Sequence, residues 1–375
     1  MWIFSNLRGT IEDPQPSWKS GFMLRTFLVL FLAGITARVL PAQGVSAPWR
    51  DGSVQGQGVS REVREIYEKG LEWLIANQLQ DGSWPSPNNP GPGATGLCVL
   101  TFLAYGEDPN FGVHKTQILR GLQHLIGQQD PKTGYLGGSM YHHGFATLAL
   151  AEAYGAIDEN DFWQGSKIAE ARRRSLAKAL ELAVRTSITS QDKNSTGGWR
   201  YGPNSTDADT SVSGAILVSL LAARNAGIEV PDKNIDRAIS YFTSMTSKSG
   251  QVAYAGGLGG FDESQARVSI ATLVYAIAGR KDLKEFRACS TFLKAKDVVK
   301  VGDHYGEYTS YYKAQALFQA DIEAWEKWNK VLIKELKSTQ KSDGRFDGSF
   351  GPCVATSMSL LSLALNFRFL PIYER

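Results

Sequence analysis

The sequence predicts an all-α fold in which six helix pairs close into an (α/α)6 toroid. A unit of about fifty residues recurs along the chain, which is the signature of a repeat architecture. Each unit joins an amphipathic helical pattern, a loop with glycine near an aromatic residue, and a second helical pattern rich in small residues. The first and last units both keep this loop, so neither has the atypical sequence of a cap on an open solenoid. A closed ring needs no caps, and we therefore expect closure.

The opening unit shows the pattern most clearly. Lys69–Leu74 belongs to its first helix, Gln78–Trp84 forms its loop, and Ala94–Tyr105 belongs to its second helix. The other loops follow at similar intervals, and the fifth copy is degenerate. We expect the loop glycines at Gly82, Gly134, Gly198, Gly250, near Gly302, and at Gly344.

The two helices of a unit differ in which residues they bury. The first helix carries apolar residues at helical spacing, as in Leu71, Leu74 and Ile75, which predicts an outer helix with one buried face. The second helix is lined with Ala, Gly, Ser and Thr, and small residues on most of its surface allow close contacts on both sides. These second helices should form an inner ring, with a first copy near Leu97–Tyr105 followed by Phe145–Tyr154, Ser211–Ala223, Val268–Gly279, Ala314–Ala320 and Val354–Leu365.

The charge balance excludes one class of partner. The chain of 375 residues has 40 Lys and Arg against 37 Asp and Glu, a formal net charge of +3. This balance gives no electrostatic footprint for nucleic acid, so we expect no nucleic-acid partner. The short basic run Arg172–Arg174 fits the solvated face of an outer helix. Residues 61–375 are enough to bury the core of a single toroid domain.

The N-terminal region has the pattern of a secretion signal. Met23-Leu24-Arg25 precedes the apolar stretch Thr26–Ala37, and Leu40-Pro41-Ala42 fits a cleavage site. We expect residues 1–42 to be a leader, with translation starting at Met23, and residues 43–60 to be a flexible linker rich in Gly, Ser and Gln. The mature protein should then be exported to the periplasm or beyond, without an integral membrane span. A membrane anchor formed by an uncleaved signal is the alternative.

The cysteines support no disulfide framework, because Cys98, Cys289 and Cys353 are odd in number and lie far apart. Buried apolar cysteine is the simplest interpretation, and an exported protein could hold one bridge or none. A zinc site is the sharper alternative, but the sequence has no C-x-x-C or H-x-x-x-H spacing. We therefore expect neither a metal nor another cofactor.

The starts of the inner helices are the natural place for a site. Inner helices of a toroid run parallel, so their N-termini should ring one mouth of the cavity and turn backbone N–H groups toward it. Helix capping is the competing explanation for the aspartates at these starts, and a satisfied structural role is the competing explanation for the histidines. The candidate catalytic residues are Asp207, Asp209 and His143, and the candidate ligand-binding residues are Thr95, His142, Arg267, Glu307, Tyr308 and Tyr311.

Several stretches resemble a known repeat family. Lys69–Trp84 resembles the QW repeat of squalene-hopene and oxidosqualene cyclases, and the pattern covers nearly all of residues 60–370. It is similar to that of the β-subunits of protein prenyltransferases, which are also α-α toroids. Met140–Gly144, Gly197–Tyr201 and Leu370–Tyr373 resemble a set of exported bacterial proteins of this repeat class with no settled activity. The repeat is specific for fold and weak for function.

Asp207-Ala208-Asp209-Thr210 resembles the D-x-D-D motif of class II terpene cyclases, with Thr210 in place of the last Asp. The resemblance implies that Asp209 is the acid that protonates an alkene or epoxide, a role that needs a carboxyl kept protonated by burial. It also implies an active site between two α-barrel domains, whereas this chain has length for one. The inner-helix aromatics are moderate in number for a cavity that stabilises carbocations.

Three functions stay open. The first is an enzyme that acts on an isoprenoid, with Asp209 as general acid. The second is a non-catalytic exported protein whose cavity binds a peptide, a glycan or an anionic ligand. The third is a structural repeat protein without a small-molecule site. The prenyltransferase resemblance would imply a zinc held by Asp, Cys and His and a helical partner subunit, but that trio has no matching positions here.

Overall fold

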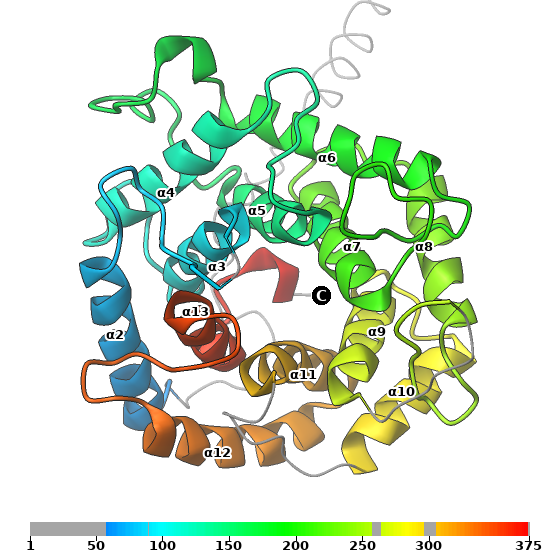
Figure 1. Ribbon diagram of the computed structural model, residues 1–375. Helices are drawn as coiled ribbons and strands as arrows, with labels where there is room; N and C mark the ends of the chain where they lie inside the picture. The colour runs from blue at the N-terminus through cyan, green and yellow to red at the C-terminus, as the bar shows by residue number, and fades with distance from the viewer. Residues whose placement is uncertain (1–57, 89, 257–263, 296–304, 374–375) are drawn as a thin grey trace, which may run out of the picture. The chain divides into compact units, whose positions relative to one another are not determined.

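Two concentric rings of helices build the fold (Figure 1). The computed structural model describes residues 58–88, 90–256, 264–295 and 305–373. Within these residues twelve α-helices alternate between the rings, which confirms the predicted (α/α)6 toroid. The outer ring consists of α2 (Arg61–Ala76), α4 (Lys115–Gln128), α6 (Leu176–Asp192), α8 (Asp232–Ser244), α10 (Lys284–Ala295) and α12 (Ile322–Thr339). The inner ring consists of α3 (Pro92–Ala104), α5 (Met140–Ala153), α7 (Thr210–Asn225), α9 (Gln265–Ile277), α11 (Gly306–Ala320) and α13 (Pro352–Leu363).

The inner ring is closed. Each inner helix contacts the next one in chain order, and α13 contacts α3, as expected for the segments Leu97–Tyr105 and Val354–Leu365. Small residues make this close packing possible. A Cβ added at Gly96 would lie 2.7 Å from the carbonyl oxygen of Phe145, and one at Gly144 would lie 2.9 Å from the carbonyl carbon of Ala215. Any side chain at these two glycines would therefore push neighbouring inner helices apart.

A repeated glutamine contact joins four of the six units to the next unit in the ring. Gln191, at the end of α6, donates from Nε2 to the carbonyl of loop residue Gly197 (2.6 Å) and to the carbonyl of Asn234 on α8 (2.9 Å). Gln340 makes the same pair of bonds to Gly344 and to Ile66 on α2, so the contact between successive units also closes the ring. The other two copies of this contact are made by Gln78 and Gln129.

One sequence-based expectation needs correction. The loop glycine of the third unit is Gly197, with a φ of 87°, and not Gly198, because Gly197 adopts the left-handed conformation that the loop requires. Helix α11 begins at Gly306, so Glu307 and Tyr308 lie at an inner-helix start as expected, and the small-residue stretch Ala314–Ala320 covers only its second half. Its first two turns carry tyrosines instead of small residues, so the small-residue pattern starts late. The expected loop near Gly302 lies outside the described residues.

The N-terminal expectations fall largely on residues that the structure does not describe. The predicted leader, residues 1–42, and residues 43–57 of the predicted linker lie outside the described part. Ser60, the last linker residue, caps α2 by accepting a hydrogen bond from the Val63 N–H. No helix among the described residues is both long and apolar enough to cross a membrane.

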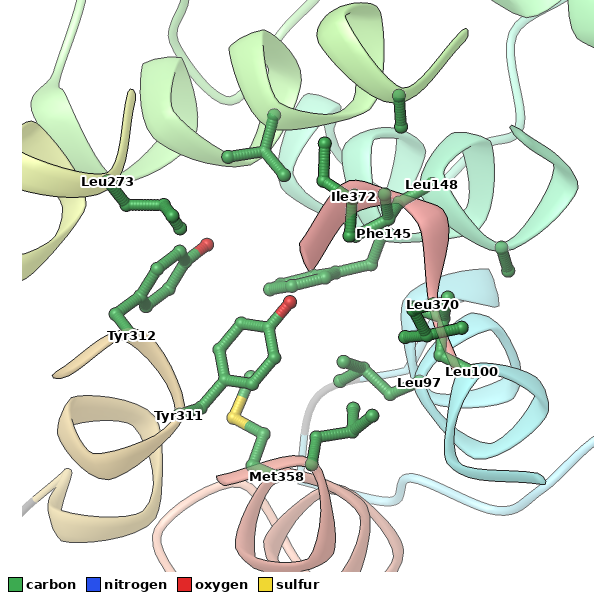
Figure 2. Close-up of a cluster of buried hydrophobic side chains, with 14 of the residues drawn as sticks. Leu97, Leu100, Phe145, Leu148, Leu273, Tyr311, Tyr312, Met358, Leu370 and Ile372 are labelled. Carbon is green, nitrogen blue, oxygen red and sulfur yellow. The ribbon is translucent and has the colours of Figure 1, made fainter. Parts of the chain in front are cut away.

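The chain after α13 turns back into the inner ring. Two short 3-10 helices follow α13, η2 (Ala364–Asn366) and η3 (Pro371–Tyr373), and η3 lies inside the ring (Figure 1). Leu370 and Ile372 are each 3% exposed. Figure 2 shows both among inner-helix side chains that include Phe145 and Leu148. The C-terminal segment therefore forms part of the core at the centre of the toroid.

Candidate functional site

Asp209 is fixed in position by the loops on either side of it. It is the N-cap residue of α7, and its backbone N–H donates to the carbonyl of Trp199 (2.9 Å). The next N–H, that of Thr210, donates to the carbonyl of Tyr254 (2.9 Å). Isolated antiparallel bridges link Asp209 to Trp199 and to Ala255. Two loops thus hold the backbone of Asp209 at the start of an inner helix.

The two carboxyl oxygens of Asp209 have different environments. Oδ1 accepts a hydrogen bond from the Val212 N–H (2.8 Å), so Asp209 does cap α7. Oδ2 is buried and accepts no hydrogen bond from any described residue. Burial raises the pKa of this carboxyl to about 6, although the Val212 hydrogen bond and the Arg200 charge oppose the rise. Capping therefore occupies Oδ1, whereas Oδ2 has no hydrogen bond from the described residues.

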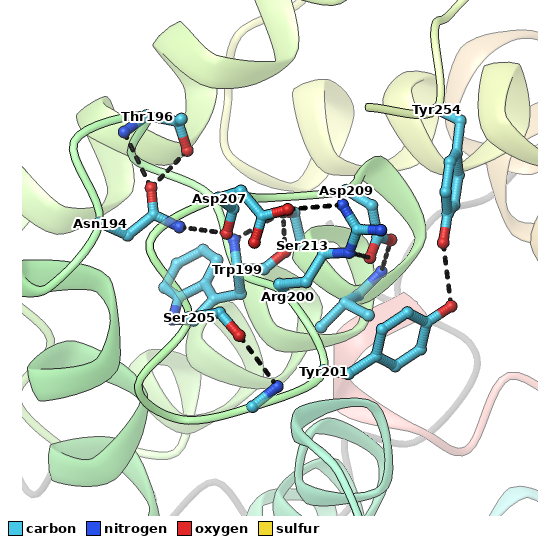
Figure 3. Close-up of polar contacts among 12 residues, drawn as sticks. Asn194, Thr196, Trp199, Arg200, Tyr201, Ser205, Asp207, Asp209, Ser213 and Tyr254 are labelled. Carbon is cyan, nitrogen blue, oxygen red and sulfur yellow. Dashed lines mark hydrogen bonds and ion pairs between the residues drawn. The ribbon is translucent and has the colours of Figure 1, made fainter. Parts of the chain in front are cut away.

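Arg200 is the arginine that contacts Asp209. Its Nε lies 3.5 Å from Oδ2 of Asp209, and its Nη1 donates to Oδ2 of Asp207 (2.8 Å), as Figure 3 shows. Asp207 is exposed, and its carbonyl accepts a hydrogen bond from Nδ2 of Asn194 (2.6 Å). Of the two aspartates in the motif, Asp207 therefore faces solvent and Asp209 faces the protein interior.

A column of aromatic side chains leads from Asp209 into the ring. Tyr141 and Tyr308 both lie close enough for the charge of Asp209 to raise the pKa of their hydroxyls further, beyond the main effect of burial. Their ring centres are 6.2 Å apart. Phe145 continues the column, with its ring centre 5.2 Å from that of Tyr141 and 6.2 Å from that of Tyr311. The interior next to Asp209 is therefore aromatic and apolar.

A cationic and aromatic rim surrounds the outer side of Asp209. The guanidinium carbons of Arg200 and Arg267 lie 5.7 Å and 6.0 Å from the ring centre of Tyr254. Burial lowers the pKa of Arg267. The Tyr254 hydroxyl is hydrogen bonded to that of Tyr201 (2.9 Å), whose side chain is 50% exposed. Arg200 and Tyr254, which were not among the expected site residues, thus lie near Asp209, and the expected residue Arg267 lies on the ring of Tyr254.

His143 and Thr95 bind loop backbone. The Leu136 N–H donates to Nδ1 of His143 (3.2 Å), so the ring proton is on Nε2, which donates to the Ala183 carbonyl (3.0 Å). Both nitrogens are thus occupied, and burial lowers the pKa of His143 to about 4. The Trp84 N–H donates to Oγ1 of Thr95 (3.2 Å) in the same way. Equivalent bonds to the loop are accepted by Ser213 and Thr356.

The other candidates lie around the column. Nδ1 of His142 accepts a hydrogen bond from the Gly93 N–H (3.3 Å), and burial lowers the pKa of His142. His142 also lines a small pocket of about 20 Å³ beside Tyr141, Phe145 and Met358. Oε1 of Glu307 accepts from the Ser349 N–H (3.0 Å). Tyr311 lies deeper in the ring, where the charge of Glu152 raises the pKa of its hydroxyl in addition to burial.

The described part of the chain has neither a group of side chains that could hold a metal ion nor an accessible thiol. No three His, Cys, Asp or Glu side chains there are grouped so that they could hold a metal ion. Cys98, Cys289 and Cys353 are all buried and not in disulfides. Burial raises the pKa of the Cys98 thiol well above its usual value, which keeps it protonated and unreactive.

Sequence reasoning missed Arg200, Tyr141 and Tyr254. Arg200 directly follows the loop aromatic Trp199, which itself bridges to Asp209. The position of Arg200 directly after the loop aromatic was the sequence signal that could have located it. Tyr254 occupies a related place after the Gly250 loop and reaches Asp209 only because the two loops pair at Thr210.

Comparisons with known proteins support the fold. The sequence matches no protein-family model and no curated protein. A structure of the type II terpene cyclase MstE from Scytonema with geranylgeranyl dihydroxybenzoate is similar, with a TM-score of 0.53 and 15% identity over 82% of this chain and 98% of that chain. An unsaturated glucuronyl hydrolase specific for heparin is also similar, with a TM-score of 0.55 and 12% identity over 82% of this chain and 96% of that chain. This chain shares the α/α-toroid fold of both enzymes.

The likeness to the MstE structure extends over nearly all of that chain, and at 15% identity it shows the shared fold alone.

Proposed function

We propose that this protein binds an isoprenoid-like chain in the centre of its inner ring and that Asp209 donates a proton to it. One observation carries the proposal. Oδ2 of Asp209 is buried and accepts no hydrogen bond from the described residues, although Nε of Arg200 lies 3.5 Å away, and Asp209 lies near the tyrosines at the head of the aromatic column. Protonation of a carbon–carbon double bond needs an acid that is kept from water, and the burial of Oδ2 meets this requirement.

The aromatic column suits the intermediate that such a proton transfer would create. The faces of Tyr141, Phe145 and Tyr311 are electron rich and attract a cationic centre placed over them. The fold is shared with MstE, which is solved with a geranylgeranyl substrate. An apolar, branched polyene is therefore the substrate class that fits this interior best.

Arg200 sets the conditions under which Asp209 can be an acid. Its positive charge favours the ionised carboxylate, whereas burial favours the neutral acid, and burial dominates in raising the pKa to about 6. Asp207 holds the guanidinium at 2.8 Å and so shares its charge. We propose that Arg200 positions Asp209 and tunes its acidity without donating a proton itself.

The rim gives a second candidate function. Tyr201 is half-exposed beside Arg200, and hydroxyl and guanidinium groups of this kind bind carboxylates and sugars. The fold is also shared with a heparin-specific glucuronyl hydrolase. A non-catalytic toroid that binds an acidic glycan or peptide at this rim is therefore the alternative.

A substrate panel separates the two functions. Purified protein is incubated with squalene, geranylgeraniol, geranylgeranyl dihydroxybenzoate and heparin disaccharides, and products and binding are followed by mass spectrometry. We expect a cyclised isomer of a polyene from the wild type and from Asp207→Asn, and none from Asp209→Asn. Binding of the disaccharides without any polyene product would support the alternative and overturn the acid role.

Export is the remaining part of the proposal. The signal-like pattern of Met23–Ala42 motivates the proposal of export. Under this proposal the toroid lies outside the cytoplasmic membrane. Mass-spectrometric mapping of the mature N-terminus in the native host tests cleavage after residue 42. A mature protein that still contains Thr26–Ala37 would contradict it.

A further inference from the structure

The C-terminal segment occupies the space that a ligand of the inner ring would need. Leu370 and Ile372 are buried inside the ring, while Pro371 between them is exposed. Figure 2 shows Ile372 next to Phe145, which belongs to the aromatic column, and Leu370 next to Leu97 and Leu100 of another inner helix. The chain's own branched apolar side chains thus lie where we propose an isoprenoid would bind.

The free space beside the column is too small for such a ligand. The pocket lined by Tyr141, Phe145 and Met358 is about 20 Å³ in volume. Sites for drug-sized molecules measure roughly 300–1,000 Å³. A chain with many carbons therefore does not fit in this pocket, and it gains room when a segment of the protein leaves the ring. The inner helices are held in place, because each contacts both of its neighbours in the closed ring.

The C-terminal segment is held by contacts that can be broken without opening the ring. The Ile372 N–H donates to Oε2 of Glu152 at 3.4 Å, which is a long hydrogen bond. The turn into the ring needs Arg368 at a φ of 58°, a left-handed conformation that costs free energy for a residue with a side chain. The Arg368 guanidinium lies 5.0 Å from the ring centre of Phe318 and steadies that turn.

We propose that the segment Leu370–Ile372 is a removable plug that closes the isoprenoid chamber and must leave before a ligand binds there. This inference rests on the proposed function, since it concerns access to the same chamber. Release of the segment would transfer Leu370 and Ile372 from the ring to water, and the incoming apolar chain would replace their contacts. The ligand and the segment therefore compete for one space, and the resting protein is autoinhibited.

Hydrogen–deuterium exchange of the wild-type protein tests whether a ligand displaces the C-terminal segment. Geranylgeraniol is the probe, its binding is measured by equilibrium dialysis, and the deuterium uptake of the peptide covering residues 368–373 is followed by mass spectrometry. We expect uptake in this peptide to accelerate at least about tenfold when the probe is bound. Bound probe with unchanged uptake would overturn the plug.

A pair of variants gives an independent readout. Ile372→Asp places a charge in the apolar interior and should release the segment, whereas Pro371→Asp places the same charge on the exposed side. We expect Ile372→Asp to bind geranylgeraniol about tenfold or more tightly than wild type, because the closed state no longer lowers the apparent affinity. Pro371→Asp should bind as the wild type does. Equal affinity of Ile372→Asp and Pro371→Asp would overturn the plug, and the hydrogen-exchange result stands alone if Ile372→Asp does not fold.

The plug and the proposed chemistry can fail separately. If Asp209 is not an acid, the probe still accelerates exchange in residues 368–373 but no polyene is converted. If the segment is not a plug, polyene is bound or converted while exchange in residues 368–373 stays unchanged. Absence of probe binding by both the wild type and Ile372→Asp would refute the two proposals together.

Discussion

Nε of Arg200 lies 3.5 Å from the buried Oδ2 of Asp209, while Nη1 of the same guanidinium holds the exposed Asp207 at 2.8 Å. One arginine thus links an acid inside the ring to an acid at its surface. The charge on Arg200 stabilises ionised Asp209 and limits how far burial can raise its pKa. The balance between these two effects decides whether Asp209 can be a proton donor.

Replacing Arg200 with Leu should shift that balance. Loss of the guanidinium removes the opposing charge, so the pKa of Asp209 should rise further, by about one unit or more. We expect the basic limb of the pH–rate profile for polyene conversion, where the rate falls as Asp209 loses its proton, to move to higher pH. Arg224→Leu is the matched control, since Arg224 pairs with exposed Asp232 at the far end of α7. A profile that does not move in Arg200→Leu would contradict a tuning role.

Asp209→Asn should change how stability depends on pH. An acid with a pKa of about 6 in the folded state and 3.8 unfolded binds more protons when folded between these pH values. Stability therefore falls as pH rises through this window, by up to about 3 kcal/mol in total. Asn keeps the helix cap but does not titrate, so the fall should be absent from its urea-unfolding curve.

Asp321 provides a control of opposite sign. It also caps a helix, α12, but the Ala324 N–H and Lys294 lower its pKa. Its contribution to stability is present above the unfolded pKa and is lost as pH falls, so Asp321→Asn should reduce stability at neutral pH more than in acid. If both variants show the same pH trend, the buried environment assigned to Asp209 is wrong.

His143→Thr should affect stability and leave catalysis intact. Thr95 and Thr356 accept the equivalent loop hydrogen bond, so Thr can replace one of the two bonds of His143. Loss of the bond to Ala183 should cost about 1–3 kcal/mol at neutral pH. The wild type loses stability as pH falls from 6.5 toward about 4, because the unfolded chain binds a proton at His143 that the buried, neutral ring of the folded protein does not bind, and the variant should lack this loss. A large drop in turnover with unchanged stability would instead indicate a catalytic histidine.

Gln191→Met should destabilise the ring more than Gln78→Met. Both glutamines bond to two backbone carbonyls, but Gln191 is fully buried and also accepts a hydrogen bond from Nδ2 of Asn234. Its loss leaves buried polar groups unpaired, at about 1–3 kcal/mol each. Gln78 is half-buried, so water can replace its bonds. Thermal unfolding should show a clearly lower Tm for Gln191→Met, and equal Tm values would contradict this account.

The sequence was sufficient to predict the fold because the fold repeats. Helical period, small residues on inner helices and loops at near-constant intervals all point to one ring, and its closure needs no information beyond the repeat itself. The small-residue pattern was a weaker guide to the full length of α11. Glu307, Tyr308 and Tyr311 replace small residues at the start of α11, so its first turns do not show the inner-helix pattern.

The candidate site was only partly predictable. Asp209 stands out because an acid before an apolar helix either caps it or serves a site, and here one carboxyl oxygen caps the helix while the other faces Arg200. Arg200 reaches Asp209 through loop pairing, which depends on backbone bonds that the sequence does not display. The partners of His143 are likewise backbone groups, of Leu136 and Ala183. Every residue type offers such a group, so the sequence does not reveal which residue is the partner.

The central claim is that Asp209 protonates a polyene inside the ring, and the isotope content of the product tests it most directly. The wild type and Asp209→Asn are incubated with geranylgeranyl dihydroxybenzoate in D2O, and the product is analysed by mass spectrometry. We predict that wild-type product carries one carbon-bound deuterium, delivered by the exchanged carboxyl of Asp209, and that Asp209→Asn forms no product. Product without deuterium, or equal product from Asp209→Asn, would contradict the claim.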